Sequence, residues 1–317
     1  APHTADCVEN IIKLAFPPEW VTVVQGGPEV GKSLLEERWD FMMYTGGVQV
    51  AKIVAAAAAK HLTPTLLELG GKNPCIVDNS AKIKVAARRI VFGKFLNCGQ
   101  TCIAPDYVIV HNSVKHALVK AMIQAIEESY GADQSNSEDY GHIINDRHFK
   151  RLTSLLKSQN ITYGGHTNPK KRYIQPTLIE LSDTNNPLME EEIFGPILPI
   201  LTYENDTDLT TIIEQYEKPL SFYVFSGRKS WSKNMMRSYS YGGGIINDTL
   251  LQFTNRNLPF GGIGKSGTGA YHGKHSFYAF THNKPYIKRS SWPDPSYRYA
   301  PYKKKMGFLR KLVKWLG

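Results

Sequence analysis

The stretch that decides the fold is residues 41–71, which read FMMYTGGVQVAKIVAAAAAKHLTPTLLELGG. Two short apolar runs in it, Phe41–Thr45 and Thr65–Leu69, each end at a pair of glycines. Between them, Val48–Leu62 is a long run of small and apolar residues with the length of a helix. A strand, a helix and a second strand in this order are typical of a parallel sheet with helices on its faces, which predicts an α/β fold.

The same alternation continues on both sides of this stretch. Upstream, the pattern predicts a helix at Thr4–Ala15, a strand at Val21–Val24 and a helix at Ser33–Trp39. Because the pattern starts on a helix and a βαβ unit takes about 30 residues, we expect the chain to enter its sheet midway, with an earlier part before Ala1. The downstream predictions are strands at Tyr107–His111, Leu198–Tyr203 and Phe222–Ser226, and a helix at Ser113–Tyr130.

The composition is that of a folded protein whose charge is unevenly placed. Of 317 residues, 42% are hydrophobic and 21% are charged, and the net charge is +10, which excludes a disordered chain. Residues 284–317 hold ten Lys or Arg and one Asp, so this tail has a net charge of +9 and the rest of the chain is almost neutral. A nucleic-acid-binding protein would carry basic clusters across one face, so we expect no nucleic-acid partner.

Cysteines, histidines and apolar runs indicate the cellular compartment and whether the chain binds a metal or spans a membrane. Cys7, Cys75, Cys98 and Cys102 include no Cys-x-x-Cys pair, so we expect free thiols in a reducing compartment. The ten histidines form no cluster that suggests a metal, so we predict none. Runs of 18 apolar residues and a charged-then-apolar leader are both missing, so we expect a cytoplasmic protein without a spanning helix.

Residues 26–33, GGPEVGKS, match the template of a phosphate-binding loop, in which backbone N–H groups cradle phosphates and a lysine reaches them. They lie between a predicted strand and a predicted helix, and Asp78 after a later apolar run matches the metal-binding acid of such proteins. The alternative is an ordinary strand-to-helix turn. Because four other motifs in the chain agree with one another instead, we interpret this match as coincidence.

Cys102 and Glu68 are candidate catalytic residues on chemical grounds. Gly99 would admit another molecule close to Cys102, and a polar run ahead of a predicted helix would place the thiol where the helix dipole lowers its pKa. A nucleophilic cysteine needs a partner for its proton. Glu68 in its apolar strand is the candidate, because burial raises the pKa of a carboxyl group towards that of a useful base. The alternatives are a small buried thiol and a salt-bridged carboxylate.

Four segments resemble signatures of the aldehyde dehydrogenase superfamily. Residues 67–74, LELGGKNP, resemble its glutamate signature, and residues 95–102, FLNCGQTC, resemble its cysteine signature. Residues 191–196, EEIFGP, resemble its cofactor-ribose motif, and residues 258–267, LPFGGIGKSG, resemble the segment that closes its catalytic domain. The stretches that resemble the class 3, fatty-aldehyde branch are residues 56–64 and 270–274. The resemblance implies an α/β fold with a partial Rossmann-like dinucleotide-binding domain and an α/β catalytic domain.

The resemblance also implies a role for each matching residue. Cys102 would attack the aldehyde carbonyl to form a thiohemiacetal, a hydride would pass to NAD (NADP is possible), and Glu68 would activate the water that hydrolyses the resulting thioester. Glu192 would bind the nicotinamide ribose and is a rival general base, and Phe194 would pack nearby. The cofactor pyrophosphate would face the turn and helix start of Gly46, Gly47, Val48, Gln49, Val50 and Ala51.

Two departures from the family pattern affect these expectations. The family turn commonly has glycine where this chain has Ala51, which would crowd the cofactor slightly. The family's first strands, its oxyanion-hole asparagine and its adenosine-side lysine would lie before Ala1, and loss of one oxyanion donor typically costs about 10²–10³ in rate. We expect residues 1–69 to be the C-terminal part of the dinucleotide-binding domain, 70–283 the catalytic domain and 284–317 a basic tail.

The tail ends in a predicted amphipathic helix. At about 100° per residue, its apolar residues share one face and its basic residues take the other. The apolar residues are Phe308, Leu309, Leu312, Val313, Trp315 and Leu316, and the basic ones are Arg310, Lys311 and Lys314. Such a helix is typical of membrane-surface binding, so we expect peripheral contact of residues 303–317 with an anionic intracellular membrane. The alternative is docking on its own protein or on a dimer mate.

Three functions are open at this point. The first is a homodimeric aldehyde dehydrogenase acting on medium- or long-chain aliphatic or aromatic aldehydes; the second is an inactive fragment of such an enzyme with a lipid-binding tail; the third is a phosphate-loop nucleotide hydrolase. Cys98, four residues from Cys102, is either a redox partner or an ordinary buried thiol. Asn247 either shapes the site or serves a turn.

Overall fold

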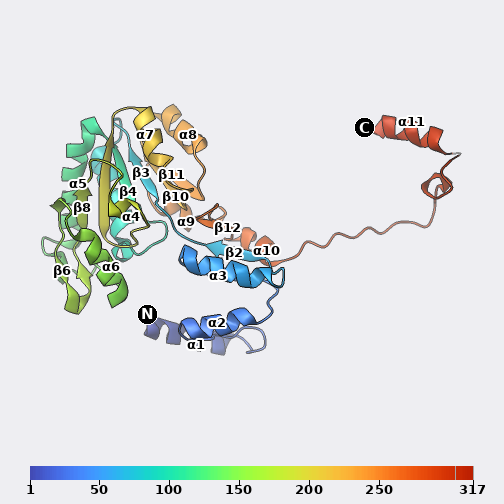
Figure 1. The fold of residues 1–317 in the computed structure, drawn as a ribbon, viewed down its shortest axis with the longest axis horizontal. Helices are drawn as coiled ribbons and strands as arrows, with labels where there is room; N and C mark the ends of the chain where they lie inside the picture. The colour runs from blue at the N-terminus through green and yellow to red at the C-terminus, as the bar shows by residue number, and fades with distance from the viewer. Residues whose placement is uncertain (304, 317) are drawn as a thin grey trace. The chain divides into compact units, whose positions relative to one another are not determined.

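The computed structural model describes residues 1–303 and 305–316 (Figure 1). The chain divides into two compact units, residues 1–280 and residues 281–317. The first unit contains all the strands that the structure describes, and it has the mixed α/β architecture that the sequence predicts.

A seven-stranded sheet forms the centre of the first unit, in the order β11-β10-β3-β4-β9-β8-β5. Its strands are β3 (Pro74–Val77), β4 (Tyr107–His111), β5 (Ile161–Tyr163), β8 (Thr177–Glu180), β9 (Ile197–Tyr203), β10 (Ser221–Phe225) and β11 (Gly243–Ile246). Every neighbouring pair is parallel except β5 with β8. The predicted parallel sheet is therefore confirmed, and the amino ends of six strands lie along one edge.

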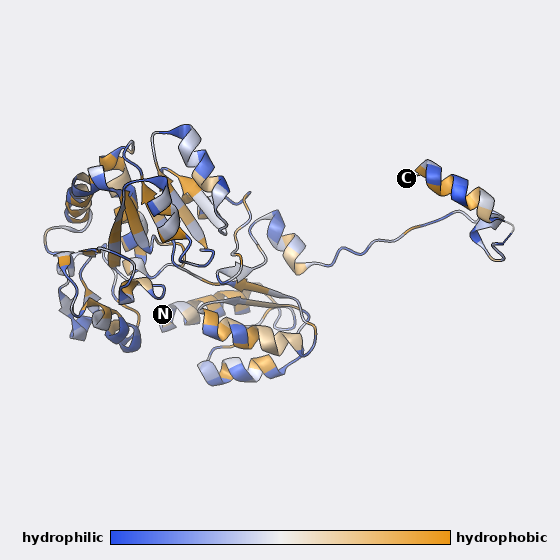
Figure 2. Ribbon diagram, turned by 45° about the horizontal axis from the view of Figure 1, so that its top comes forward, coloured by the Kyte–Doolittle hydropathy of each residue, from blue (hydrophilic) through white to orange (hydrophobic). Residues whose placement is uncertain are grey.

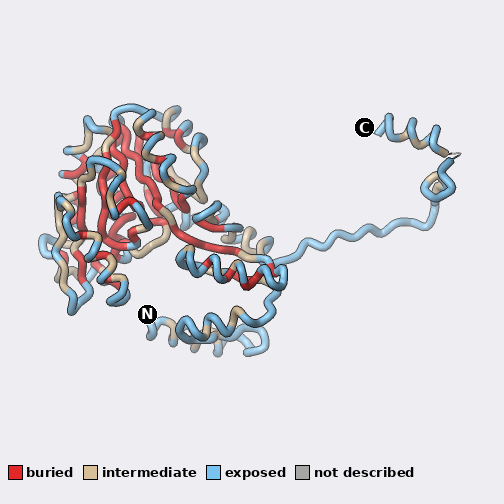
Figure 3. Tube along the Cα trace, viewed as in Figure 1, coloured by how far each residue is buried: buried red, intermediate tan, exposed pale blue. Residues whose placement is uncertain are grey.

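Helices cover both faces of this sheet, so most residues of its five inner strands are buried (Figure 3). Alternate residues of a strand point to opposite faces: Cys75 and Val77 belong to one core cluster, and Ile76 belongs to the other. The helices of the first face are α4 (Ile83–Phe95), α5 (Lys115–Tyr130) and α6 (Asp146–Leu156), and those of the second are α7 (Asp206–Ile213) and α8 (Lys229–Ser238). The apolar strands stand out in Figure 2.

A second, three-stranded sheet has the order β1-β2-β12. Its strands are β1 (Met42–Thr45), β2 (Thr65–Glu68) and β12 (Gly267–Thr268), and β1 runs parallel to β2. The helix between them is α3 (Val48–Ala59), whose buried Ala51, Val54 and Ala58 pack on Met42 and Leu67. The βαβ unit predicted for residues 41–71 is thus confirmed.

The first forty residues differ from their prediction. The helices are α1 (Pro2–Ala15) and α2 (Pro28–Glu36), which bury no residue. The strand predicted at Val21–Val24 is wrong: these residues have no regular secondary structure and no strand beside them to complete a hydrogen-bonded ladder. Helix α2 starts earlier than predicted because a proline suits the first helical position.

The remaining elements are short, apart from the terminal helix. They are β6 (Thr167–Asn168), β7 (Tyr173–Ile174), α9 (Leu251–Thr254) and α10 (Lys274–Phe280), with several turns of 3₁₀ helix. In the second unit, α11 (Met306–Leu316) carries polar and apolar residues on different sides (Figure 2). Over the described residues, none of the helices is both long and apolar enough to cross a membrane.

Candidate active site

Three loops converge at the amino edge of the large sheet. The loop before β3 contains Gly70 and Lys72, the loop before β4 contains Cys102, and the loop before β9 contains Glu192. Because β3, β4 and β9 are consecutive parallel strands in the sheet, these three loops lie side by side. Glu68 reaches the same place from the end of β2, two residues before Gly70.

Cys102 lies in a turn, and the helix predicted to start beside it is not formed. The preceding segment is a 3₁₀ turn, Leu96–Gly99, that follows the end of α4. Burial raises the pKa of the Cys102 thiol to about 11, and the nearby negative charges of Glu192 and Glu68 add to this rise. The predicted lowering by a helix dipole is therefore wrong. The N–H groups of Cys102 and Ile103 donate to the sulfur and oppose the rise only in part.

Gly99 permits a close approach, but of the chain to itself. Its φ is 72°, and a Cβ on it would lie 2.3 Å from the carbonyl oxygen of Gly195. The expectation that Gly99 admits another molecule is therefore wrong: it lets the cysteine loop pack against the loop that carries Glu192.

Glu68 is 2% exposed. Both of its carboxyl oxygens are buried without a hydrogen-bond partner among the described residues, and burial raises the pKa of this group to about 8. A salt bridge, the alternative that the sequence left open, is not formed there. An unpaired buried carboxyl group is costly, and perturbed groups of this kind cluster at functional sites.

Glu192 lies over the glycine pair that follows Glu68. A Cβ on Gly70 would meet the Glu192 carboxylate oxygen at 2.2 Å, and the N–H of Gly71 donates to this carboxylate. Burial, followed by the charge of Asp106, raises the pKa of Glu192 to about 8. Glu68, Glu192 and Cys102 are thus brought together. Phe194, two residues on, is 37% exposed with a φ of 48°.

Asn73 is a site residue whose contribution the sequence did not reveal. Its side-chain amide donates to the carbonyls of Cys102 at 2.8 Å and of Ala104 at 3.0 Å, and its oxygen accepts the N–H of Ser221 at 2.8 Å. It is 1% exposed and ties the cysteine loop to β10. The available signal was a polar residue directly before a strand that is buried throughout.

The start of α3 has the properties of an anion-binding site. Gly47 caps the helix without any side-chain hydrogen bond, which leaves the first-turn N–H groups of Val48, Gln49 and Val50 without helical partners. The preceding Gly46 donates its N–H to the carbonyl of Glu68 at 3.0 Å, so this turn is joined to the catalytic candidates. An N-terminus of this kind suits an anionic group such as a pyrophosphate.

Ala51 does not lie on the exposed side of this turn. It is 2% exposed and packs with Met42 and Leu67 in the core of the small sheet. The methyl group therefore fills the space between helix and sheet, and the crowding of the cofactor expected from it has no basis in this arrangement.

Two other motifs have structural explanations. Lys32 lies inside α2 and pairs with Glu29 at 2.9 Å, so residues 26–33 are an ordinary helix start and not a phosphate cradle. Cys98 is fully buried, its thiol donates to the Tyr140 hydroxyl at 3.4 Å, and it forms no disulfide. Within the described part of the chain, no group of three His, Cys, Asp or Glu side chains is arranged to hold a metal ion.

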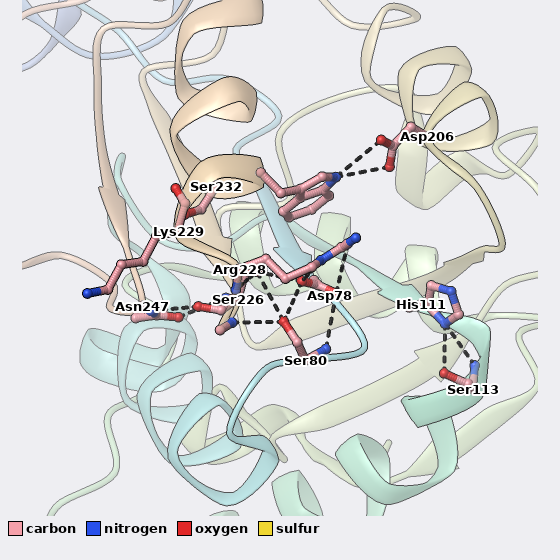
Figure 4. Close-up of polar contacts among 12 residues, drawn as sticks. Asp78, Ser80, His111, Ser113, Asp206, Ser226, Arg228, Lys229, Ser232 and Asn247 are labelled. Atoms are coloured by element: carbon pink, nitrogen blue, oxygen red, sulfur yellow. Dashed lines mark hydrogen bonds and ion pairs between the residues drawn. The ribbon is translucent and has the colours of Figure 1, made fainter.

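Asn247 serves a turn at the opposite edge of the sheet (Figure 4). Its side chain accepts the N–H of Ser226 at 2.8 Å and donates to the carbonyl of the same residue at 2.9 Å. Beside it, Arg228 pairs with the buried Asp78 at 3.0 Å. These residues follow the carboxyl ends of β11, β10 and β3, whereas Cys102 precedes the amino end of β4.

Comparison with known proteins agrees with this geometry. The family model described as "Aldehyde dehydrogenase family" matches residues 1–285. The 4,4'-diaponeurosporen-aldehyde dehydrogenase of Staphylococcus aureus is 46% identical over 99% of this chain and 69% of its own length. The dimeric NADP-preferring aldehyde dehydrogenase of Rattus norvegicus is 44% identical over 96% of this chain and 68% of its own length.

One further relative and one solved structure are also similar to this chain. Aldehyde dehydrogenase family 3 member A2 of Macaca fascicularis is 46% identical over 91% of this chain, which spans 59% of that relative. The substrate-bound state of Staphylococcus aureus AldH superimposes with a TM-score of 0.94 at 45% identity, over 98% of this chain and 69% of that one. The chain therefore belongs to the aldehyde dehydrogenase family, whose members are NAD(P)-dependent oxidoreductases that act on aldehydes.

Proposed function

We propose that this chain oxidises aldehydes to carboxylic acids, with Cys102 as nucleophile and Glu68 as general base. The observation that carries the proposal is the buried Glu68 carboxyl group, which has no hydrogen-bond partner within residues 1–303 and 305–316 and lies close enough to Cys102 for its charge to raise the thiol pKa. A base must be within reach of the proton that it takes and have a pKa near the working pH, and a pKa of about 8 meets the second condition.

The chain's own residues supply the covalent chemistry. The Cys102 thiol loses its proton, and its sulfur attacks the carbonyl carbon to give a thiohemiacetal. A nicotinamide dinucleotide, when bound, supplies the acceptor for the hydride. Once the acyl group is held on the sulfur as a thioester, Glu68 takes the proton of the water that hydrolyses it. Glu192 is the rival base, because its pKa is also about 8.

We assign the dinucleotide to the start of α3 and to the loop before β9. Gly46, Gly47, Val48, Gln49 and Val50 would bind the pyrophosphate, and Ala51 would support them from the core. The residues on the nicotinamide side are Glu192 and Phe194. We propose NAD, with NADP as the alternative. This assignment makes residues 1–69 the cofactor-binding part and residues 70–283 the catalytic part.

The surroundings of Cys102 favour an apolar aldehyde. Cys102 and Tyr271 pack against a buried cluster of Ile103, Leu220, Leu250 and Phe260. The ring centroids of Phe260 and Tyr271 lie 5.8 Å apart, and those of Phe253 and Phe260 lie 5.0 Å apart. An apolar and aromatic wall gains free energy by covering hydrocarbon. We therefore propose medium- or long-chain aliphatic or aromatic aldehydes as substrates, in a homodimer.

Formation of NADH or NADPH from a medium-chain aldehyde tests the activity. We expect turnover by the chain to fall at least about 10³-fold in Cys102→Ser and to be kept in Cys98→Ser, because Cys98 bonds to Tyr140 instead. Activity retained by Cys102→Ser would overturn the mechanism. A chain that forms no NAD(P)H while Cys102 still reacts covalently would support an inactive form of the enzyme.

We further propose that α11 binds anionic membrane surfaces. Its apolar side chains are exposed: Phe308 by 53%, Val313 by 69% and Trp315 by 82%. Its basic residues are Arg310, Lys311 and Lys314. An exposed apolar face flanked by cations complements the headgroups and acyl chains of an anionic lipid surface.

Sedimentation with lipid vesicles tests this surface. We expect the full chain to pellet with anionic vesicles and not with neutral ones, and Val313→Ser with Trp315→Ser to weaken pelleting strongly. The matched control is Leu14→Ser with Trp20→Ser, two exposed apolar residues of the first unit. Equal pelleting of the wild-type chain and the α11 variant would contradict the proposal.

A further inference from the structure

Lys72 and Asp106 form a buried ion pair between the loops that precede β3 and β4. The Nζ of Lys72 lies 2.6 Å from Oδ2 of Asp106, and the two residues are 7% and 3% exposed. Neither residue has a part in the proposed chemistry. Because removing two charges from water is expensive, a buried pair of this kind is weak evidence for stability alone, and its further hydrogen bonds indicate another role.

Both partners bind the segment that carries Glu192. Lys72 Nζ donates to the carbonyls of Leu188 at 2.7 Å and Glu191 at 3.2 Å. Asp106 Oδ1 accepts the N–H of Ile193 at 2.9 Å. The pair therefore holds the backbone directly before and directly after Glu192.

The direction of the Glu192 side chain follows from these contacts. Its carboxylate lies on Gly70 and receives the N–H of Gly71, the residue next to Lys72. Glycine at position 70 leaves the space that the carboxylate occupies, because a Cβ there would lie 2.2 Å from a carboxylate oxygen. Backbone contacts from the Lys72–Asp106 pair and this open space together place the carboxylate near Cys102 and not in solvent.

We propose that the Lys72–Asp106 pair is a positioning device that keeps the Glu192 carboxylate beside Cys102. The inference rests on the proposed site, since it assigns these two residues to the same reaction centre. Without the pair, the segment 188–193 loses three hydrogen bonds to it, and the carboxylate turns to solvent.

Titration of Glu192 distinguishes positioning from simple electrostatics. The groups that face Glu192 are Asp106, Lys94, Lys72, Arg151, Cys102 and the Gly71 N–H. Arg151 also donates to the carbonyl of Ile193, and this contact remains in every variant below. If Lys72 acted only through its charge, its removal would leave Glu192 in place with a pKa at or above its present value of about 8. If Lys72 positions Glu192, its removal exposes the carboxylate, and the pKa falls towards its ordinary value of 4.5. The two roles predict shifts of opposite sign.

The rate of Cys102 alkylation by iodoacetamide reports this titration without cofactor or aldehyde. Only the thiolate reacts, so the logarithm of the rate rises with pH, and it rises less steeply where a neighbouring carboxyl group ionises. All variants carry Glu68→Gln, which removes the other titrating neighbour, and mass spectrometry of the Cys102 peptide gives the rate between pH 6.5 and 9.5. We expect a shallower segment near pH 8 in this parent chain and a uniform slope once Glu192→Gln is added.

Lys72→Met is the decisive variant. We expect the uniform slope of Glu192→Gln, and no further change when both substitutions are combined. Lys218→Met, an exposed lysine that lines the same 270 Å³ cavity as Lys72, is the matched control and keeps the shallower segment. A shallower segment that persists in Lys72→Met, at pH 8 or above, would overturn the proposal. So would a uniform slope in the parent chain, because Glu192 would then not act on Cys102.

A second variant covers a failure of Lys72→Met to fold, since breaking a buried ion pair is strongly destabilising. Lys72→Met with Asp106→Asn removes both charges of the pair, and the new amide oxygen can still accept the Ile193 N–H. This variant loses both hydrogen bonds from Lys72 to the segment. We expect the uniform slope again, and a persisting shallower segment would contradict the inference. Turnover of aldehyde enters none of these outcomes, so failure of the proposed function is recognised separately.

Discussion

Glu68 combines two properties that a structural residue does not need: it is buried, and neither carboxyl oxygen has a hydrogen-bond partner in the part of the chain that the structure describes. The pattern of an acid inside an apolar strand was visible in the sequence, but its lack of a partner was not. That property depends on the surroundings of Glu68, which several distant segments of the chain supply. The same holds for Asn73, whose partners Cys102 and Ser221 lie 29 and 148 residues away.

The buried Glu68 makes stability depend on pH in a definite direction. Its pKa is raised from 4.5 to about 8 in the folded chain, so between these values the folded state holds a proton that the unfolded state has released. Stability therefore falls as pH rises through this window. We expect Glu68→Gln to reduce the slope by up to about one proton, measured by urea unfolding from pH 5 to 8. An unchanged slope would contradict the burial of an unpaired carboxyl group.

Gly99 is the residue at which two loops of the site touch. We expect Gly99→Ala to lower the free energy of unfolding by about 1–2 kcal/mol from its left-handed backbone and by a further ~1–3 kcal/mol from overlap with Gly195. The control is Gly264→Ala: its φ of 66° is close to that of Gly99, but the nearest atom to the added carbon is Lys218 Cδ at 3.7 Å. Equal losses in the two variants, measured by urea unfolding, would show that the loops do not pack as described.

At the scale of the element, five strands and two helices from residue 41 onward could be predicted from their apolar runs and their length. Other elements, such as α4, α6, β8 and β11, were not among the predictions. Residues 21–24 could not be predicted, because a β-branched run becomes a strand only where a neighbour pairs with it. The turn at Cys102 was missed for a related reason. The residues before it include Asn97 and Cys98 with φ values of 50° and 56°, and these left-handed conformations depend on packing and not on residue type.

Helix α3 provides a test of the βαβ unit. Ala51 faces the core and Ala56 is exposed on the same helix. Replacement of either by glycine costs about 1 kcal/mol in helix propensity. Ala51→Gly also loses a buried methyl group, worth roughly 0.8 kcal/mol. In urea unfolding we therefore expect Ala51→Gly to lower the free energy of unfolding by roughly 0.8 kcal/mol more than Ala56→Gly does. A larger loss in Ala56→Gly would contradict the packing of α3 on β1 and β2.

At the scale of the whole molecule, the α/β class and the family could be predicted from the sequence. The four resembling segments are spread over residues 67–267, and the family match covers residues 1–285. The convergence of the three site loops at the amino edge of the sheet could not be predicted, since it requires the strand order β3-β4-β9. That order joins strands from distant parts of the chain, and the local hydrophobic pattern does not determine which strands are neighbours.

The central claim is that Cys102 and Glu68 form one catalytic unit, and hydrolysis of 4-nitrophenyl acetate tests it most directly because this reaction needs no cofactor. The measurement uses a Cys7→Ser background, since Cys7 is exposed. We expect steady turnover in this parent, and at least about 10²-fold less in Cys102→Ser. In Glu68→Gln we expect a single burst of about one nitrophenolate per chain followed by a stall, because the acyl group stays on the sulfur. Unchanged hydrolysis in Cys102→Ser, or steady turnover in Glu68→Gln, would contradict the account.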